Sequence, residues 1–357
     1  MKAYTLLIFL VFLFSFNDQG KTDKSDYLNT KISTEKRIGD PISLMTLEEK
    51  TSQMNDHAST IAKNTDNLII VAADGSGDFT SVQGAIKAVP ALSEDKTVIF
   101  IKSGVYKEKV VVPTDKQNIQ FLGENAQNTV ITWDDYSGKE DIDTFSSYTI
   151  KIMGNNIMME NLTIENSEGL RGQAVALDVE GNQCVFKNCR IVGNQDTLYA
   201  AGNNNRQYFK DCYIEGTTDF IFGSSTAVFD NCDIMCKKQS FITAARTAQG
   251  KHFGYVFKNC KIKAASGIKQ VYLGRPWRAY ANVVFINCEL GGFISPEGWS
   301  NWHDTDRYKF AFYAEYHNTG AGANTNQRVA WSHQLTDEQA AIYTVENILG
   351  FNNWKLK

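Results

Sequence analysis

Val185-Phe186-Lys187-Asn188-Cys189 is the first of five closely similar pentapeptides in this chain. Each pairs a Val or Tyr with a Phe and ends in Asn-Cys or Asp-Cys, and the others span residues 208–212, 228–232, 256–260 and 284–288. The five cysteines are separated by 23, 20, 28 and 28 residues. A period of this length is typical of a solenoid, in which each coil of the chain stacks on the one before.

The composition of the coils favours a parallel β-helix over a leucine-rich repeat. The coils carry short runs of Phe, Val and Ile in place of regularly spaced leucines, and none shows helical periodicity. Because five of the seven cysteines recur at one phase, we expect a ladder of buried free thiols and not disulfides. The state of Cys184 and Cys236 stays open, and no matching Cys or His pair predicts a zinc site.

The two ends of the repeat carry helix and strand signals. Residues 68–71 read as a strand, and Thr80 with Gln83 forms a capping box before the apolar positions of a short helix that ends at Pro90. We expect this helix to cap the open end of the solenoid. A second capping box, Thr336 with Gln339, predicts a closing helix to about residue 349, and further strands are expected at 97–101, 119–122 and 129–132.

The first part of the chain reads as a targeting segment. A single early Lys precedes an apolar run at residues 6–14, which is too short to cross a bilayer comfortably and is typical of a signal peptide. We therefore expect residues 1–20 to be a signal peptide, 21–67 a polar, loosely ordered arm and 68–357 the β-helix domain. We therefore expect a secreted or periplasmic protein that has no membrane span once the signal peptide is removed. The alternative is that the apolar run stays uncleaved and anchors the protein in the membrane.

Composition narrows the classes of partner. Hydrophobic residues make up 43% of the 357-residue chain and aromatic residues 12%, which is ample for a core. The net charge of −4 gives no basic footprint for nucleic acid. An anionic polymer would have to be held by local contacts, because no global positive field exists to attract it.

Asp196 and Asp219 each stand seven residues after a repeat cysteine, Cys189 and Cys212. Equal phase in successive coils places equivalent residues about 4.8 Å apart, so the two carboxyl groups should be neighbours. Two such groups usually titrate with one raised and one lowered pKa, which suits an acid and a nucleophile or base. Spacing alone leaves three interpretations open: aspartates that only shape turns, a retaining glycosidase, or an esterase.

Neutral amides and an arginine lie near this pair in the sequence. Gln173 is one coil earlier and Gln195 precedes Asp196; amide donors suit a developing oxyanion better than an oxocarbenium ion. Arg275 can keep a carboxylate ionised and fix its direction. Aromatic side chains that could stack on sugar rings are Tyr199, Phe222 and Trp277, although core packing would explain any one of them.

Taken together, these segments resemble the pectin methylesterase (pectinesterase) family from about residue 68 to the end. The matching segments are 104–108 (GVYKE), 173–177 (QAVAL), 195–199 (QDTLY), 219–223 (DFIFG) and 273–277 (LGRPW), with 73–80 (ADGSGDFT) and 335–339 (LTDEQ) at the ends. The resemblance implies an all-β, right-handed parallel β-helix with no metal and no organic cofactor. It also implies hydrolysis of the C6 methyl esters of galacturonate units in pectin, as a monomer.

The resemblance assigns each candidate residue a role. Asp219 would be the nucleophile and Asp196 the acid and base, with Gln195 and Gln173 stabilising the oxyanion. Arg275 would hold Asp219 charged. Residues implied in substrate binding are Trp277, Tyr199 and Phe222. The alternatives are a non-catalytic β-helix that only binds pectin, or a lyase or hydrolase acting on the same polymer; the acidic calcium ligands and the basic catalytic residue of a lyase are not evident in the sequence.

Overall fold

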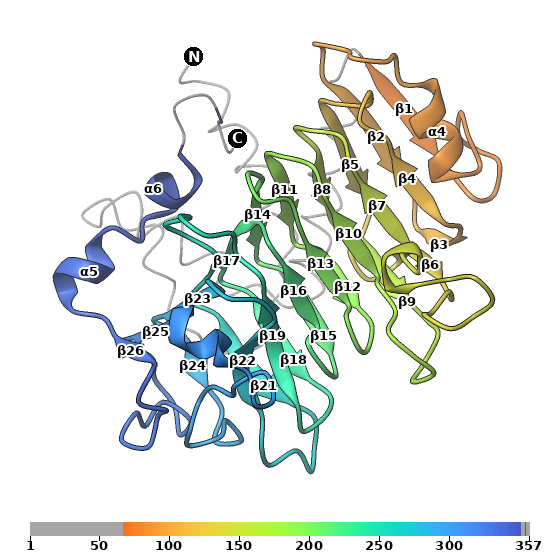
Figure 1. Cartoon of the computed structure of the whole chain (residues 1–357). Coiled ribbons are helices and arrows are strands. Elements are labelled where there is room, and N and C mark those ends of the chain that lie inside the picture. Colours follow the sequence, from red (N-terminus) through yellow and green to blue (C-terminus); the bar gives the residue numbers. More distant parts are fainter. Residues whose placement is uncertain (1–66, 351–353, 355–357) are drawn as a thin grey trace, which may run out of the picture. The chain divides into compact units, whose positions relative to one another are not determined.

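The protein is described by a computed structural model in which residues 67–350 and 354 are placed. Within these residues, all strands from β1 to β26 belong to three parallel sheets that run side by side along the coils (Figure 1). These sheets confirm the right-handed parallel β-helix expected from the sequence. The expected signal peptide and polar arm lie outside the described residues, so both stay predictions.

Sheet A carries the repeated pentapeptides on its strands. In spatial order it contains β1 (Leu68–Val71), β2 (Thr97–Ile101), β5 (Ile119–Gly123), β8 (Met158–Glu160), β11 (Cys184–Lys187), β14 (Arg206–Lys210), β17 (Thr226–Asp230), β20 (Tyr255–Lys258), β23 (Asn282–Ile286), β25 (Phe312–Tyr316) and β26 (His333–Gln334). The strands expected at residues 68–71, 97–101, 119–122 and 129–132 are all present, with the last one in sheet B.

In the coils that begin with β2 to β20, each strand of sheet A is followed by one strand of sheet B and one of sheet C. Sheet B contains β3 (Gly104–Lys107), β6 (Thr129–Trp133), β9 (Thr163–Asn166), β12 (Arg190–Val192), β15 (Tyr213–Gly216), β18 (Asp233–Cys236), β21 (Lys261–Ala264) and β24 (Glu289–Leu290). Sheet C contains β4 (Val110–Val112), β7 (Ile150–Ile152), β10 (Leu177–Val179), β13 (Leu198–Ala200), β16 (Ile221–Gly223), β19 (Phe241–Ala245) and β22 (Tyr272–Pro276).

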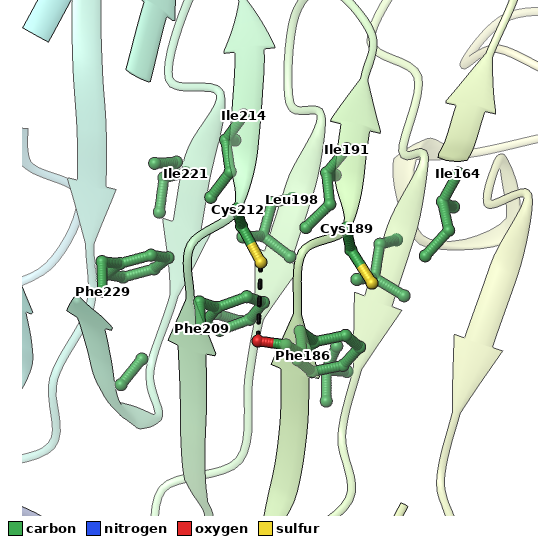
Figure 2. Close-up of a cluster of buried hydrophobic side chains, with 14 of the residues drawn as sticks. Ile164, Phe186, Cys189, Ile191, Leu198, Phe209, Cys212, Ile214, Ile221 and Phe229 are labelled. Atoms are coloured by element: carbon green, nitrogen blue, oxygen red, sulfur yellow. Dashed lines mark hydrogen bonds between the residues drawn. The ribbon is translucent and has the colours of Figure 1, made fainter. Parts of the chain in front are cut away.

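Equivalent side chains of successive coils stack inside the β-helix. The ring of Phe209 lies 4.6 Å from that of Phe186 and 4.8 Å from that of Phe229, with interplanar angles of 8° and 11°. Beside this stack, the thiol of Cys212 donates to the carbonyl oxygen of Phe186 at 3.5 Å (Figure 2). The other repeat cysteines make the same bond to the preceding coil. The ladder therefore holds each coil in register with the last.

All seven cysteines are buried free thiols, which confirms the expected ladder of five and shows that Cys184 and Cys236, outside the ladder, are free thiols too. Burial raises the pKa of Cys184 to about 12. A thiol with so high a pKa stays protonated at neutral pH and makes a poor nucleophile. Cys184 is therefore a small core side chain and not a reactive group.

The backbone conformation explains why Asn or Asp precedes each repeat cysteine. Asn188, Asp211, Asn231, Asn259 and Asn287 all have positive φ, between 48° and 56°. Among side chains with a Cβ, Asn and Asp adopt this left-handed conformation most readily. The repeated Asn or Asp therefore marks the turn that leads from sheet A into sheet B.

The amino-terminal helix α4 (Val82–Ala88) packs against β1 and β4, as expected of a cap. Its predicted capping box is wrong by one residue. Ser81, not Thr80, is the N-cap and accepts from the N–H of Gly84. The third residue of the helix is then Gly84, which has no side chain to return the bond, and the Gln83 amide exchanges two hydrogen bonds with the backbone of Val111. The side chain of Glu108 accepts from the N–H groups of Val82 and Gln83.

The closing segment is two short helices and not one. α5 (Asp337–Ala341) begins with the predicted capping box of Thr336 and Gln339, and a second N-cap at Thr344 starts α6 (Val345–Leu349). Gly350 ends α6 with φ of 61°, as expected. Apolar residues of this segment cover the outer face of sheet A. No helix of the described residues is long and apolar enough to cross a membrane.

Candidate active site

Asp196 and Asp219 occupy equivalent turns between sheets B and C in adjacent coils. Asp196 lies between β12 and β13, and Asp219 lies between β15 and β16. Leu198 and Ile221, each two residues further on, are partners in the parallel ladder. Stacking of coils therefore makes the two aspartates neighbours, as expected. Both have positive φ, 65° and 49°, a conformation that tends to persist where surrounding structure fixes it at functional sites.

A cavity of about 180 Å³ opens over both aspartates. Its floor includes Phe222 of β16 and Ala244 of β19, which are partners in the ladder of sheet C. Loops from distant parts of the chain supply the walls. The lining residues are Thr144, Phe145, Gln173, Asp196, Asp219, Phe222, Ala244, Trp277 and Trp302. Two carboxyl groups thus share one partly aromatic pocket.

Arg275 on β22 holds Asp219 with two hydrogen bonds. Its Nε donates to Oδ1 at 3.0 Å and its Nη2 donates to Oδ2 at 2.6 Å. The two side chains are only 13% and 7% exposed, so water weakens the pair little. The guanidinium lies 4.0 Å from the ring centroid of Phe241 and 4.1 Å from that of Trp302. This packing fixes the direction of the Asp219 carboxylate.

Gln173 connects Asp196 to the cavity-lining loop that contains Thr144. Its Nε2 donates to Asp196 Oδ2 at 2.6 Å. Its Oε1 accepts from the hydroxyl of Thr144 at 3.0 Å. Thr144 begins the short 3-10 helix η3 (Thr144–Ser146), and both residues line the cavity. An amide hydrogen of Gln173 that does not bond Asp196 is left for a ligand atom.

The two carboxyl groups differ in proton affinity. Burial raises the pKa of Asp196 well above its usual range, and the charge of Asp219 raises it further, against the hydrogen bond from Gln173 and the charge of Arg275. Burial also raises the pKa of Asp219, while the hydrogen bonds and charge of Arg275 lower it. The expectation that one pKa would be lowered is therefore wrong, because burial outweighs the arginine. The order is as expected, with Asp196 the stronger proton holder.

Two predicted residues lie outside the cavity lining. Gln195 precedes Asp196, but its backbone carbonyl accepts from Ala174 and its half-buried side chain is not among the residues that line the cavity. Tyr199 is the ladder partner of Phe222 in the preceding coil and is buried, with its ring 4.7 Å from that of Phe222 and 5.1 Å from that of Phe145. Its hydroxyl accepts from Arg246 at 2.6 Å. Gln173, Phe222 and Trp277 line the cavity.

Sequence reasoning missed several wall residues. Thr144, Phe145 and Trp302 come from loops outside the repeat, where no period exists to place them. Phe241, which stacks on Arg275, does lie within the repeat, so its position in the coil could have identified it. It is the ladder equivalent of Asp219 in the next coil, but counting seven residues from Cys232 points to Gln239, because the intervening turn is two residues longer.

The arrangement suits acyl transfer. A carboxylate held by an arginine can attack a carbonyl, a protonated carboxyl beside it can supply a proton to a leaving group, and an amide N–H can meet an oxyanion. Among the described residues, no group of three or more His, Cys, Asp or Glu side chains is arranged to hold a metal.

Comparisons with known proteins agree with this chemistry. The family model described as Pectinesterase matches residues 68–352. Pectinesterase 31 of Arabidopsis thaliana is 41% identical over 291 residues, which cover 78% of this chain and 91% of that protein. The structure of a pectin methylesterase from carrot matches with a TM-score of 0.76 at 36% identity, covering 80% of this chain and 94% of the other.

A second solved structure extends the comparison to a ligand complex. It is a pectin methylesterase in complex with a hexasaccharide, with a TM-score of 0.70 at 30% identity, covering 81% of this chain and 98% of that one. The family match spans nearly all of the described residues, including every residue of the cavity. The chain therefore belongs to the pectinesterase family of carboxylic ester hydrolases.

Proposed function

We propose that this enzyme removes C6 methyl esters from the galacturonate units of pectin, with Asp219 as nucleophile and Asp196 as general acid and base. Pectin as substrate rests on the family and on the relative crystallised with a hexasaccharide. The observation that carries the residue roles is the bidentate bond from Arg275 to Asp219, in a cavity that Asp196 and Gln173 share.

The first half-reaction forms an acyl-enzyme. A carboxylate oxygen of Asp219 attacks the ester carbonyl carbon, and the carbonyl oxygen becomes an oxyanion facing the free amide hydrogen of Gln173. When the intermediate collapses, the bond to the methoxyl oxygen breaks and Asp196 gives its proton to the departing methanol. The product is an anhydride between Asp219 and the galacturonate carbonyl. The raised pKa of Asp196 supports this role, because the acid must still hold its proton at the start.

The second half-reaction reverses the proton transfer. Asp196, now ionised, takes a proton from water, which attacks the galacturonate carbonyl of the anhydride. The bond to Asp219 breaks, which releases de-esterified pectin and restores both carboxyl groups. Trp277 and Phe222 offer apolar faces on which sugar rings can pack beside the reacting ester. Gln195 keeps its proposed oxyanion role only if its side chain turns toward the ligand on binding.

Methanol release and acidification of highly methylated pectin test the proposal. Wild type should release methanol and Asp219→Ala almost none. Asp211→Ala is a matched control, since Asp211 also has positive φ in a turn of the same coil but is exposed. Equal release by wild type and Asp219→Ala would refute the nucleophile. No release by wild type, with pectin still bound, would indicate a binding protein, and unsaturated product from unmethylated polygalacturonate would indicate a lyase.

We also propose that the protein is exported and acts as a monomer. The signal-like sequence of residues 1–20 supports export, and the monomer is carried over from the family resemblance. Expression of the full chain and of a chain lacking these residues, followed by assay of cells and medium or periplasm, tests export. Activity that stays inside the cell for both chains would contradict it, and light scattering of the purified enzyme tests the monomer.

A further inference from the structure

The loop of residues 134–147 contacts Gln173 at two points. The backbone N–H of Ser137 donates to the Gln173 carbonyl oxygen at 2.8 Å. The hydroxyl of Thr144 donates to Gln173 Oε1 at 3.0 Å, and this is the only hydrogen bond of the Thr144 side chain among the described residues. One loop thus holds both the main chain and the side-chain amide of the residue that faces the oxyanion position.

Thr144 is itself held close to the segment that carries Gln173. The carboxylate of Asp143 caps η3 by accepting from the N–H of Ser146 at 2.7 Å. The hydroxyl of Ser147 donates to the Thr144 carbonyl at 2.6 Å and accepts from the N–H of Val175 at 3.1 Å. Val175 is two residues from Gln173, so the Thr144 backbone and the Gln173 backbone are linked through one buried serine.

The base of the loop is fixed by charge and by a buried amide. Asp135 accepts from Lys109 at 2.7 Å and from Lys139 at 2.9 Å. The side-chain amide of Asn166, which is buried, donates to the carbonyl oxygens of Asp135 and Ser147 at 2.9 and 3.0 Å. These bonds tie both ends of the loop to one point of sheet B. The Thr144 hydroxyl therefore has a fixed position relative to the cavity.

Two anchors decide where the Gln173 amide points. Asp196 is ionised once it has protonated the leaving methanol, and an ionised carboxylate can only accept, so the NH₂ end of the amide must face it. The oxygen end then faces Thr144, whose hydroxyl donates to it. With both ends held, the plane of the amide is fixed, and the second N–H belongs to a side chain that lines the cavity. With one end held, the amide could rotate about its last torsion angle.

We infer that Thr144 is a positioning residue for the de-esterification, holding the amide of Gln173 so that one N–H faces Asp196 and the other faces the oxyanion. This inference rests on the proposed function. Removal of a whole oxyanion donor lowers kcat by about 10²- to 10³-fold, so loss of its anchor should cost less, about 10- to 100-fold. KM should change little, because the bond acts in the transition state.

The test compares Thr144→Val, Thr144→Ser and Ser146→Ala with wild type, measuring kcat and KM for methanol release from pectin. Valine keeps the shape and the β-branch of threonine but has no hydroxyl, so kcat should fall, and serine should restore most of it. Ser146→Ala is the control for loop loosening, since it removes a hydroxyl from the same turn that does not touch Gln173. Its kcat should stay well above that of Thr144→Val.

A double-mutant cycle with Gln173→Ala separates positioning from other roles. If Thr144 acts through Gln173, Thr144→Val should lower kcat in wild type and have no further effect in the Gln173→Ala background. An equal fall in both backgrounds, a change confined to KM, or equal losses in Ser146→Ala and Thr144→Val would overturn the inference. An inactive wild-type enzyme would instead contradict the proposed function. If Thr144→Val is fully active while Asp219→Ala is inactive, only the role of Thr144 is contradicted.

Discussion

Replacement of Arg275 by lysine or methionine should shift the pH dependence of the enzyme in a defined direction. Asp219 is 7% exposed, and its burial raises its pKa while Arg275 lowers it. Removal of the arginine bonds therefore raises the pKa further. Since only the ionised carboxylate attacks the ester, the acid limb of kcat/KM against pH must move to higher pH.

The size of the shift follows from the two hydrogen bonds at 3.0 and 2.6 Å. A hydrogen bond to a charged group is worth about 1.5–3 kcal/mol, and one pKa unit is about 1.4 kcal/mol. Lysine can replace one bond at most and loses the stacking on Phe241, so Arg275→Lys should shift the limb by about 1–2 units. Methionine leaves a buried carboxylate unpaired, a loss of about 3–5 kcal/mol, so Arg275→Met should shift it by about 2–3.5 units.

The assay is the initial rate of methanol release on one pectin sample at a series of pH values. Arg328→Lys is the matched control. Arg328 makes a similar buried pair with Glu315, at 2.7 and 3.1 Å, away from the cavity. This control should lower thermal stability and leave the acid limb in place. The reasoning is refuted if the limb stays in place in both Arg275 variants, or moves equally in Arg328→Lys.

Three further predictions concern the second carboxyl group and the repeat. Asp196→Asn should lower kcat by about 10²- to 10⁴-fold and abolish the alkaline limb of the pH profile of kcat. That limb reports the loss of the proton from the Asp196 carboxyl, whose pKa is raised. If the alkaline limb persists in the variant, another group is responsible for it. Phe209→Ala, which removes a fully buried ring from between two stacked neighbours, should lower the free energy of unfolding in urea by about 3–5 kcal/mol, and a loss below about 1 kcal/mol would show that the core closes over the gap. Asn231→Gly should be more stable than Asn231→Ala by about 1–2 kcal/mol in the same assay, since φ is 54° and both variants lose the same side-chain bond to Asp211; equal stabilities would contradict the turn argument.

Much of the fold could be predicted because each repeated residue type answers a structural need that recurs in every repeat. Phe209 and its equivalents recur since each ring must stack on the last, and Asn231 and its equivalents recur since the turn needs a left-handed residue. Prediction was weaker where no repeat existed. The predicted capping box of Thr80 and Gln83 was wrong, because the Gln83 side chain pairs with the backbone of Val111, which is distant in the sequence.

Only part of the candidate site could be predicted from the sequence. The pairing of Asp196 with Asp219 could be derived from the spacing of Cys189 and Cys212, since stacked coils repeat along one axis. Which of the two glutamines faces the pair could not. Gln173 lines the cavity and Gln195 does not. The Gln173 side chain is held by Asp196 and by Thr144, and Thr144 lies in a loop that the spacing of the repeat does not place.

The sequence by itself determined the coil, the stacked core and the placement of two aspartates in adjacent turns. These features repeat, and a repeated contact between nearest coils is written in the spacing of the chain. The tertiary structure alone decided the proton order of the pair, the clamp from Arg275, the packing of Trp302 upon it and the hold of Thr144 on Gln173. Each of these depends on burial, or on loops that meet from distant parts of the chain, and neither leaves a period in the sequence.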